Sequence, residues 1–293
     1  MRVLITGCHG QVGSCLTEQF ADNENITVLA LDRQHLDITS QDAVSTVVTE
    51  FQPSVIINAA AHTAVDKAEE EVELSYAINR DGPKYLAQAA QAIGAAILHI
   101  STDYVFEGNK VGDYIETDPT NPQGVYGESK LAGEIAVAKS CDKHIILRTA
   151  WVFGEHGHNF VKTMLRLGES RDSLSIVGDQ FGGPTFAGDI ASALIQIAKR
   201  ITQGSEVEYG IYHYSGLPHV SWYDFADAIF DVAVQQKVLV NKPALTSITT
   251  DQYPTPAKRP SNSRLNNEKI MTNFFIEASD WKVALNNIQA YTD

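Results

Sequence analysis

The chain opens on a strand that leads directly into a glycine-rich turn. Residues 3–6 are an apolar run, and the next segment, TGCHGQVG, spaces Gly7, Gly10 and Gly13 three residues apart before a helical pattern at 12–20. Glycines at this spacing permit a tight turn and close approach of the backbone to a pyrophosphate, whose oxygens then face amides at the helix N-terminus. The order of strand, turn and helix therefore predicts a dinucleotide-binding unit. A glycine turn without a ligand is the alternative.

Strand and helix patterns continue to alternate through the first half of the chain. Strand-like runs occupy residues 27–31, 54–58, 96–101 and 144–149, and helical patterns occupy 41–51, 74–92 (broken near Gly82-Pro83) and 126–139. Strands separated by helices imply βαβ units and a parallel sheet that is covered on both faces. We predict an α/β fold: a Rossmann-type doubly wound parallel sheet with a smaller mixed α/β substrate lobe.

The sequence changes character after residue 148. We expect an aromatic, glycine- and histidine-rich loop at 151–158, helices at 160–167, 190–201 and 222–234, and an irregular loop at 242–263, which contains four prolines. Residues 1–149, together with 187–203, are assigned to the dinucleotide-binding domain. Residues 150–186 and 204–293 form the predicted substrate-binding lobe.

Composition limits the possible partners and the compartment. The net charge of −14 argues against nucleic acid or an anionic membrane as the main partner. Three cysteines without a C-x-x-C pair favour a reducing compartment. The sequence has no signal-peptide pattern and no apolar run long enough to span a membrane. We therefore expect a cytoplasmic protein that acts as a monomer or a homodimer.

The ends of the second and third strands carry candidate cofactor contacts. Asp32 lies 19 residues after Gly13, where an acid can accept hydrogen bonds from the adenosine ribose, whereas Arg33 could receive a 2′-phosphate. A plain turn is the alternative for Asp32. The small residues of NAAAHT would let a cofactor pass over the strand ends, or would simply pack tightly. The candidate contacts to NADPH or NADH are Gly7, Gly10, Gln11, Val12, Gly13, Asp32, Arg33, Asp37, Ile38, Ala59, Ala60, Ala61, Thr63, Tyr126 and Lys130.

The segment VYGESKLAGE places Tyr126 four residues before Lys130, so both side chains share one helix face. A nearby positive charge lowers the pKa of a phenol. Thr102, at the end of the fourth strand, can donate a hydrogen bond to a carbonyl oxygen to which Tyr126 delivers a proton. Lys130 can bind the nicotinamide ribose of a cofactor that supplies hydride. A surface helix with an incidental tyrosine and lysine is the alternative.

Seven segments in order along the chain resemble the dTDP-4-dehydrorhamnose reductase family of extended short-chain dehydrogenases/reductases. They are TGCHGQVG, NAAAHTAVDKAE, STDYVFEG, VYGESKLAGE, RTAWVFGEHGHNFVKTMLRL, DQFGGPTFAGDIA and TPAKRPSNSRL. The resemblance places the family's catalytic triad on Thr102, Tyr126 and Lys130. It implies reduction of dTDP-4-dehydro-L-rhamnose to dTDP-L-rhamnose with NADPH or NADH, in nucleotide-sugar and cell-surface polysaccharide biosynthesis.

Related sugar-nucleotide dehydratases carry an Asp-Glu pair after the threonine, whereas this chain has Asp103-Tyr104. The missing glutamate favours simple reduction. Asp103 is a candidate substrate contact, or only orients its loop. Two other hypotheses stay open: another nucleotide-sugar reductase or epimerase of this fold, and a non-catalytic regulatory subunit that resembles the family.

A basic cluster in the second half suggests how a diphosphate is held. Lys258, Arg259 and Arg264 fall within seven residues of an otherwise acidic chain, and arginine offers paired donors to phosphate. A solvated loop is the alternative for this cluster. The resemblance also implies that Trp151 packs on the sugar, although a core tryptophan would need no ligand. We therefore count Arg259, Arg264 and Trp151 among the substrate-binding candidates.

No metal site is predicted. The resemblance makes a Mg²⁺-bridged dimer possible, because some family members are described as holding this ion with acidic side chains. This chain has Cys15 at the first-helix position, and the nearest acid in GGPTFAGDIA, Asp189, is displaced by one residue. The sequence therefore does not support bound Mg²⁺.

Overall fold

A parallel sheet of six strands forms the centre of the computed structural model, which describes residues 1–21 and 25–292. The strand order is β10-β5-β4-β3-β1-β2, and every neighbouring pair is parallel. The strands are β1 (Arg2–Thr6), β2 (Thr27–Leu31), β3 (Val55–Asn58), β4 (Ala96–Thr102), β5 (His144–Thr149) and β10 (Gly210–His213). Since all strands run the same way, their carboxyl ends lie along one edge, where ligands of such sheets bind.

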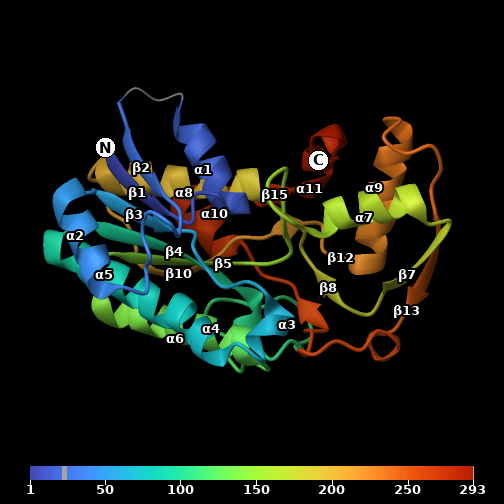
Figure 1. Cartoon of the computed structure of the whole chain (residues 1–293), viewed down its shortest axis with the longest axis horizontal. Coiled ribbons are helices and arrows are strands. Elements are labelled where there is room, and N and C mark those ends of the chain that lie inside the picture. Colours follow the sequence, from blue (N-terminus) through green and yellow to red (C-terminus); the bar gives the residue numbers. More distant parts are fainter. Residues whose placement is uncertain (22–24, 293) are drawn as a thin grey trace.

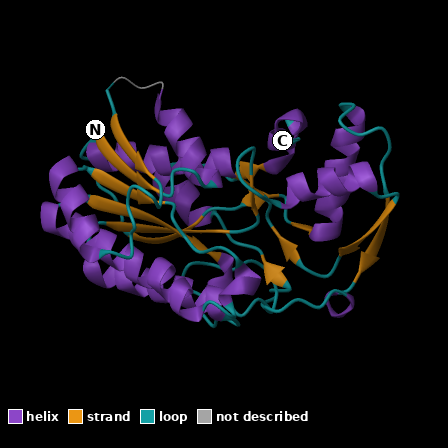
Figure 2. Ribbon diagram, in the orientation of Figure 1, coloured by secondary structure: helices purple, strands orange, loops and turns teal. Residues whose placement is uncertain are grey.

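Helices cover both faces of this sheet (Figures 1 and 2). Alternate residues of a strand point to opposite faces, so Val3 and Ile5 pack with one set of helices and Leu4 with the other. The first set comprises α1 (Gln11–Ala21), α8 (Ala187–Thr202) and α10 (Glu268–Phe274). The second comprises α2 (Gln41–Phe51), α5 (Gly82–Ile93) and α6 (Val125–Ser140). The doubly wound α/β prediction is confirmed.

A smaller lobe with its own aromatic core lies beside the sheet (Figure 1). Phe153, Phe225, Phe230 and Trp281 are buried in that core. Its elements are α7 (Phe160–Ser170), β7 (Ser173–Val177), β8 (Phe181–Gly182), β12 (Val220–Ser221), α9 (Trp222–Gln235), β13 (Ala244–Ile248), η3 (Thr250–Gln252), β14 (Asn262–Ser263), α11 (Trp281–Leu285) and η4 (Ile288–Tyr291).

Short elements connect the two parts and line the edge of the sheet. They are α3 (Val65–Ala68), α4 (Val72–Tyr76), the π-helical η1 (Ala77–Asp81), η2 (Asp103–Val105), β6 (Val152–Phe153), β9 (Thr185–Phe186), β11 (Gly216–Leu217) and β15 (Ser279–Asp280). The helical pattern at 74–92 is therefore divided by a π-helical segment before Gly82. None of the described helices is long and apolar enough to cross a membrane.

Two sequence-based expectations were wrong. The segment 242–263 is not one irregular loop, because β13 pairs in parallel with β7 and β14 pairs with β8. The expected loop at 151–158 contains the short strand β6. In addition, β10 was not predicted, although it extends the main sheet beside β5. The proposed domain boundaries stay a prediction. Residues 210–213 and 268–274 pack with the first domain in the structure. Residues 22–24 and 293 of the proposed ranges lie outside the described residues.

Candidate active site

The glycine-rich turn is pressed against neighbouring backbone. Gly7 has φ of 73°, and a Cβ atom on it would lie 2.7 Å from Cα of Ala60. A Cβ atom on Gly13 would lie 2.0 Å from the carbonyl oxygen of Gly7, so any side chain at either position would force the turn open. Helix α1 begins at Gln11, and amides in its first turn lack acceptors within the helix. These residues fit a pyrophosphate at the helix N-terminus.

Asp32 holds the loop that it opens. Its Oδ1 accepts from the backbone amides of Gln34 and His35 at 3.0 Å and lies 2.6 Å from Nδ1 of His35. Nδ1 of His9, from the glycine turn, lies 3.3 Å from the other carboxylate oxygen. Hydrogen bonding to His35 lowers the pKa of Asp32. In this structure Asp32 therefore makes the contacts of a turn residue, which was the alternative to a ribose contact. Arg33 beside it is exposed.

The other candidates near the adenosine end have structural partners. Asp37 accepts from the amide and hydroxyl of Thr39 at 3.0 and 2.7 Å. Ile38 is buried against Gly82. Neither arrangement tests the prediction that they meet the adenine.

A buried polar network, which the sequence analysis missed, orders the end of β3. Asn58 accepts from the hydroxyl of Thr6 at 2.7 Å and from the amide of Ala60 at 3.1 Å, and its Nδ2 lies 2.9 Å from Nδ1 of His99. Burial lowers the pKa of His99 well below its ordinary value. The network joins the carboxyl ends of β1 and β3 to the middle of β4. Ala59, Ala60 and Ala61 are half-buried and Thr63 is exposed along this edge.

The three catalytic candidates lie near one another at the end of β4. Thr102 ends the strand, and its hydroxyl donates to Oδ1 of Asp103 at 3.0 Å. Tyr126 and Lys130 project from the first turns of α6, and Nζ of Lys130 donates to the carbonyl oxygen of Ile100, on the same strand, at 2.6 Å. The ring of Tyr104 meets that of Tyr126 edge-on, with centroids 5.3 Å apart.

Burial dominates the protonation of this cluster. It raises the pKa of Tyr126 to about 12, an effect partly offset by a hydrogen bond with Thr102. It also lowers the pKa of Lys130 to about 8, against the opposing charge of Glu134. We expected Lys130 to lower the pKa of Tyr126, but in this structure burial raises that pKa above its ordinary value. The raised pKa of Tyr126 favours its phenol form in this structure.

Asp103 is almost completely buried beside the threonine. Its exposed fraction is 4%, and its Oδ2 has no hydrogen-bond partner among the described residues. Burial raises the pKa of this carboxyl to about 6, although hydrogen bonds from Ser263 and Thr102 act in the opposite direction. The carboxyl of Asp103 is therefore held beside Thr102 at the end of β4, and Ser263 of β14 is close enough to affect its pKa.

A cleft of about 570 Å³ is lined mainly by the small lobe, with Asp66 and Tyr104 on the side of the sheet. Thr102, Tyr126 and Lys130 are not among its described lining residues, but Tyr104 packs against Tyr126. Trp151 lines the cleft with φ of 50° and stacks on Trp222, their ring centroids 3.5 Å apart. Arg259 also lines it, and its Nη2 donates to Oδ2 of Asp66 at 2.6 Å. Arg264 is not among the described lining residues; it donates to Asn262 and lies over the ring of Phe181.

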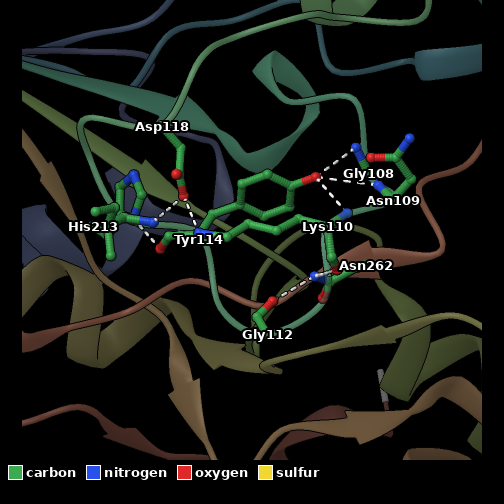
Figure 3. A network of polar contacts seen from close by, with 9 residues as sticks. Gly108, Asn109, Lys110, Gly112, Tyr114, Asp118, His213 and Asn262 are labelled. Atoms are coloured by element: carbon green, nitrogen blue, oxygen red, sulfur yellow. Dashed lines mark hydrogen bonds and ion pairs between the residues drawn. The ribbon is translucent and has the colours of Figure 1, made fainter.

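The loop after β4 is joined to β14 by the side chain of Asn262, which reaches the loop backbone (Figure 3). The hydroxyl of Tyr114 accepts from the amides of Gly108, Asn109 and Lys110 at 3.0–3.1 Å. Nδ2 of Asn262 donates to the carbonyl oxygens of Lys110 and Gly112 at 2.7 Å. The loop therefore fixes Asn262, which precedes Ser263 in β14, beside the main sheet.

The residues at the family's Mg²⁺ position do not fit that ion. Cys15 is buried, and burial together with Glu155 raises the pKa of its thiol to about 12. Asp189 accepts from the hydroxyl of Ser279 at 2.6 Å. Within residues 1–21 and 25–292, no cluster of three or more His, Cys, Asp or Glu residues is arranged to hold a metal.

Comparison with known proteins gives consistent matches over almost the whole chain. Residues 1–292 match the RmlD substrate binding domain family. The dTDP-4-dehydrorhamnose reductase of Aggregatibacter actinomycetemcomitans is 57% identical over 100% of this chain and 99% of its own. The crystal structure of the Clostridium acetobutylicum dTDP-4-dehydrorhamnose reductase has a TM-score of 0.90 at 42% identity, covering 99% of this chain and 98% of the other. The Bacillus anthracis reductase, solved in complex with NADP, has a TM-score of 0.90 at 37% identity, covering 98% of each chain.

Proposed function

This chain belongs to the RmlD substrate binding domain family, and from that premise we propose that Thr102, Tyr126 and Lys130 carry out its reaction. The chain is an NAD(P)H-dependent oxidoreductase that reduces dTDP-4-dehydro-L-rhamnose to dTDP-L-rhamnose. The observation that carries the assignment of roles is that Thr102 ends β4, Lys130 donates to the carbonyl oxygen of Ile100 on that strand, and Tyr126 packs against Tyr104, which lines the cleft.

When bound, the nicotinamide supplies the hydride that becomes the new C–H bond at C4 of the sugar. Thr102 donates a hydrogen bond to the keto oxygen, and Tyr126 gives that oxygen its proton, so the carbonyl becomes a hydroxyl. Lys130, which here donates to the carbonyl oxygen of Ile100, would hold the hydroxyls of the nicotinamide ribose. Its positive charge then stabilises the phenolate that Tyr126 leaves behind.

The remaining candidates divide between the two ligands. The glycine turn and the ends of β2 and β3 take the cofactor, and Arg259, Trp151 and Asp103 take the dTDP-sugar. Tyr104 supports reduction over dehydration, because its ring packs against Tyr126 where a dehydratase would need a second carboxyl group. We further propose that the protein works in the cytoplasm as a monomer or homodimer; its three described cysteines are free and buried, which suits a reducing compartment.

The test is Tyr126→Phe, which removes the proton donor and keeps the ring. We expect NADPH oxidation with the keto sugar to fall by roughly 10²–10⁴-fold, while NADPH affinity stays near that of the parent. Lys130→Met should weaken both NADPH affinity and rate. A Phe variant with more than about half the parent rate would contradict the assignment.

The same assay separates the two alternatives. A regulatory subunit would bind the nucleotides without net NADPH oxidation. An epimerase would convert the sugar without consuming stoichiometric cofactor. Equimolar formation of NADP⁺ and dTDP-L-rhamnose by the parent, lost in Tyr126→Phe, excludes both.

A further inference from the structure

One helical turn beyond Lys130 lies a buried ion pair that the proposed reaction does not use. Glu134 of α6 and Arg148 of β5 each have 2% of their side chain exposed. The guanidinium donates twice to the carboxylate, from Nε to Oε1 at 2.9 Å and from Nη2 to Oε2 at 2.7 Å. The hydroxyl of Ser101, on β4, donates to the same Oε1 at 2.5 Å. A single carboxylate therefore joins one helix to two strands.

These three residues are adjacent to the catalytic candidates along each element. Tyr126, Lys130 and Glu134 recur every four residues and so share one face of α6. On β4, Ser101 lies between the carbonyl that binds Lys130 and the catalytic Thr102. The β4–β5 register places Ser101 directly opposite Arg148.

Helix α6 is also held by a second element, through residues next to the same face. A Cβ atom on Gly133 would lie 2.0 Å from the carbonyl oxygen of Asn79, in the π-helical η1. Nδ2 of Asn79 donates to the hydroxyl of Ser129 at 3.0 Å. The helix therefore has little freedom to slide along the sheet.

A buried ion pair is a costly way to attach a helix to a sheet. Desolvation of two charges often cancels their attraction, and apolar side chains of similar volume hold two elements together at least as well. What the ion pair adds is directional geometry and a fixed negative charge beside Lys130.

We propose that Glu134 is a positioning residue. By holding α6 to Ser101 and Arg148, it fixes where Lys130 and Tyr126 lie relative to Thr102. This inference depends on the proposed function, because it assumes that Lys130 binds the nicotinamide ribose.

Its charge has a second consequence. The charged or titratable groups near Lys130 among the described residues are Tyr126 and Glu134 on its own helix and His99 on β4. Arg148 of β5 is paired to the carboxylate of Glu134. Burial lowers the pKa of Lys130 to about 8, and Glu134 opposes this. Loss of the carboxylate charge therefore lowers the pKa of Lys130 further, so that the lysine loses its proton at a lower pH.

The test measures the dissociation constant of NADPH by fluorescence from pH 6 to 10, with no sugar present. Parent affinity should fall as pH rises through the pKa of Lys130. In Glu134→Gln this fall should move to lower pH by roughly one unit, and kcat for the keto sugar should drop about tenfold. In Ser101→Ala and Glu134→Asp the negative charge remains, so the fall in affinity should stay at the parent pH while kcat decreases.

Glu128→Gln is the matched control, because Glu128 is exposed on the same helix; its profile should equal that of the parent. If Glu134→Gln does not fold, Glu134→Gln/Arg148→Met removes both charges and should show the same direction of shift. An unshifted affinity profile in either folded variant overturns the proposal. A parent that does not reduce the sugar, or an active Tyr126→Phe, would instead overturn the proposed function.

Discussion

At the scale of single residues, burial decides the chemistry of this site more than sequence neighbours do. The four-residue spacing of Tyr126 and Lys130 predicted correctly that both share a helix face. It could not predict that Lys130 donates to the carbonyl of Ile100, or that burial raises the pKa of Tyr126 to about 12, because both depend on tertiary packing. Asp32 shows the same limit, since its partners His9 and His35 are set by two loops that meet only in the fold.

Asp103 gives a prediction at this scale. Burial raises the pKa of Asp103 from 3.8 to about 6 in the folded protein, so the native state holds a proton that the unfolded state has released between these values. Stability must therefore fall as pH rises from about 4 to 6. Asp103→Asn removes this dependence, and we expect it to stabilise the protein above pH 6 by up to about 3 kcal/mol.

Urea unfolding at pH 4, 5, 6 and 7 measures this effect. Asp103→Asn and the parent should agree at pH 4 and diverge by pH 7, whereas the exposed control Asp251→Asn should follow the parent throughout. A constant difference between Asp103→Asn and the parent across this range would show that Asp103 does not titrate in it.

At the scale of elements, the sequence predicted what is fully buried and missed what is short or half-exposed. Strands β1, β3, β4 and β5 are almost continuously buried, and each contains a run of at least three apolar residues, which is the pattern of a parallel sheet covered on both faces. By contrast, β13 is mostly exposed and lies between prolines, and β10 has only two fully buried residues, one of them a histidine. These strands are specified by their partners β7 and β5 rather than by their own composition.

The joint between β1 and α1 gives a prediction at this scale. Gly13→Ala places Cβ within 2.0 Å of the carbonyl oxygen of Gly7, and backbone atoms there cannot give way cheaply. We expect a loss of about 1–3 kcal/mol of stability, with weaker NADPH binding. Gly10→Ala is the control, because its Cβ would lie 3.3 Å from the same oxygen. Thermal melts without ligand should separate the two variants; equal melting temperatures would mean that the turn can relax.

At the scale of the whole molecule, the cleft is bridged by residues far apart in the chain. Asp66 precedes Arg259 by 193 positions, and its carboxylate accepts from both the guanidinium at 2.6 Å and the amide of Ala257 at 3.1 Å. The sequence identified the basic cluster, but it could not show that Arg259 lines the cleft while Arg264 contacts Asn262 and Phe181. That difference arises from the pairing of β14 with β8, which directs the two arginines to different surroundings.

The bridge gives the last prediction. Nη1 of Arg259 is buried without a partner among the described residues, so the guanidinium retains a donor for a substrate phosphate. Because a hydrogen bond to a charged group contributes about 1.5–3 kcal/mol, Arg259→Ala should raise KM for the dTDP-sugar roughly ten- to hundredfold and leave the NADPH dissociation constant unchanged. Arg264→Ala should change KM much less. If the diphosphate displaces the carboxylate from Arg259, Asp66→Asn should lower KM. Steady-state kinetics with varied sugar, beside NADPH titrations, measure all three variants. Equal increases in KM for Arg259→Ala and Arg264→Ala would contradict a specific phosphate contact by Arg259 and would mean that both arginines act only through their charge.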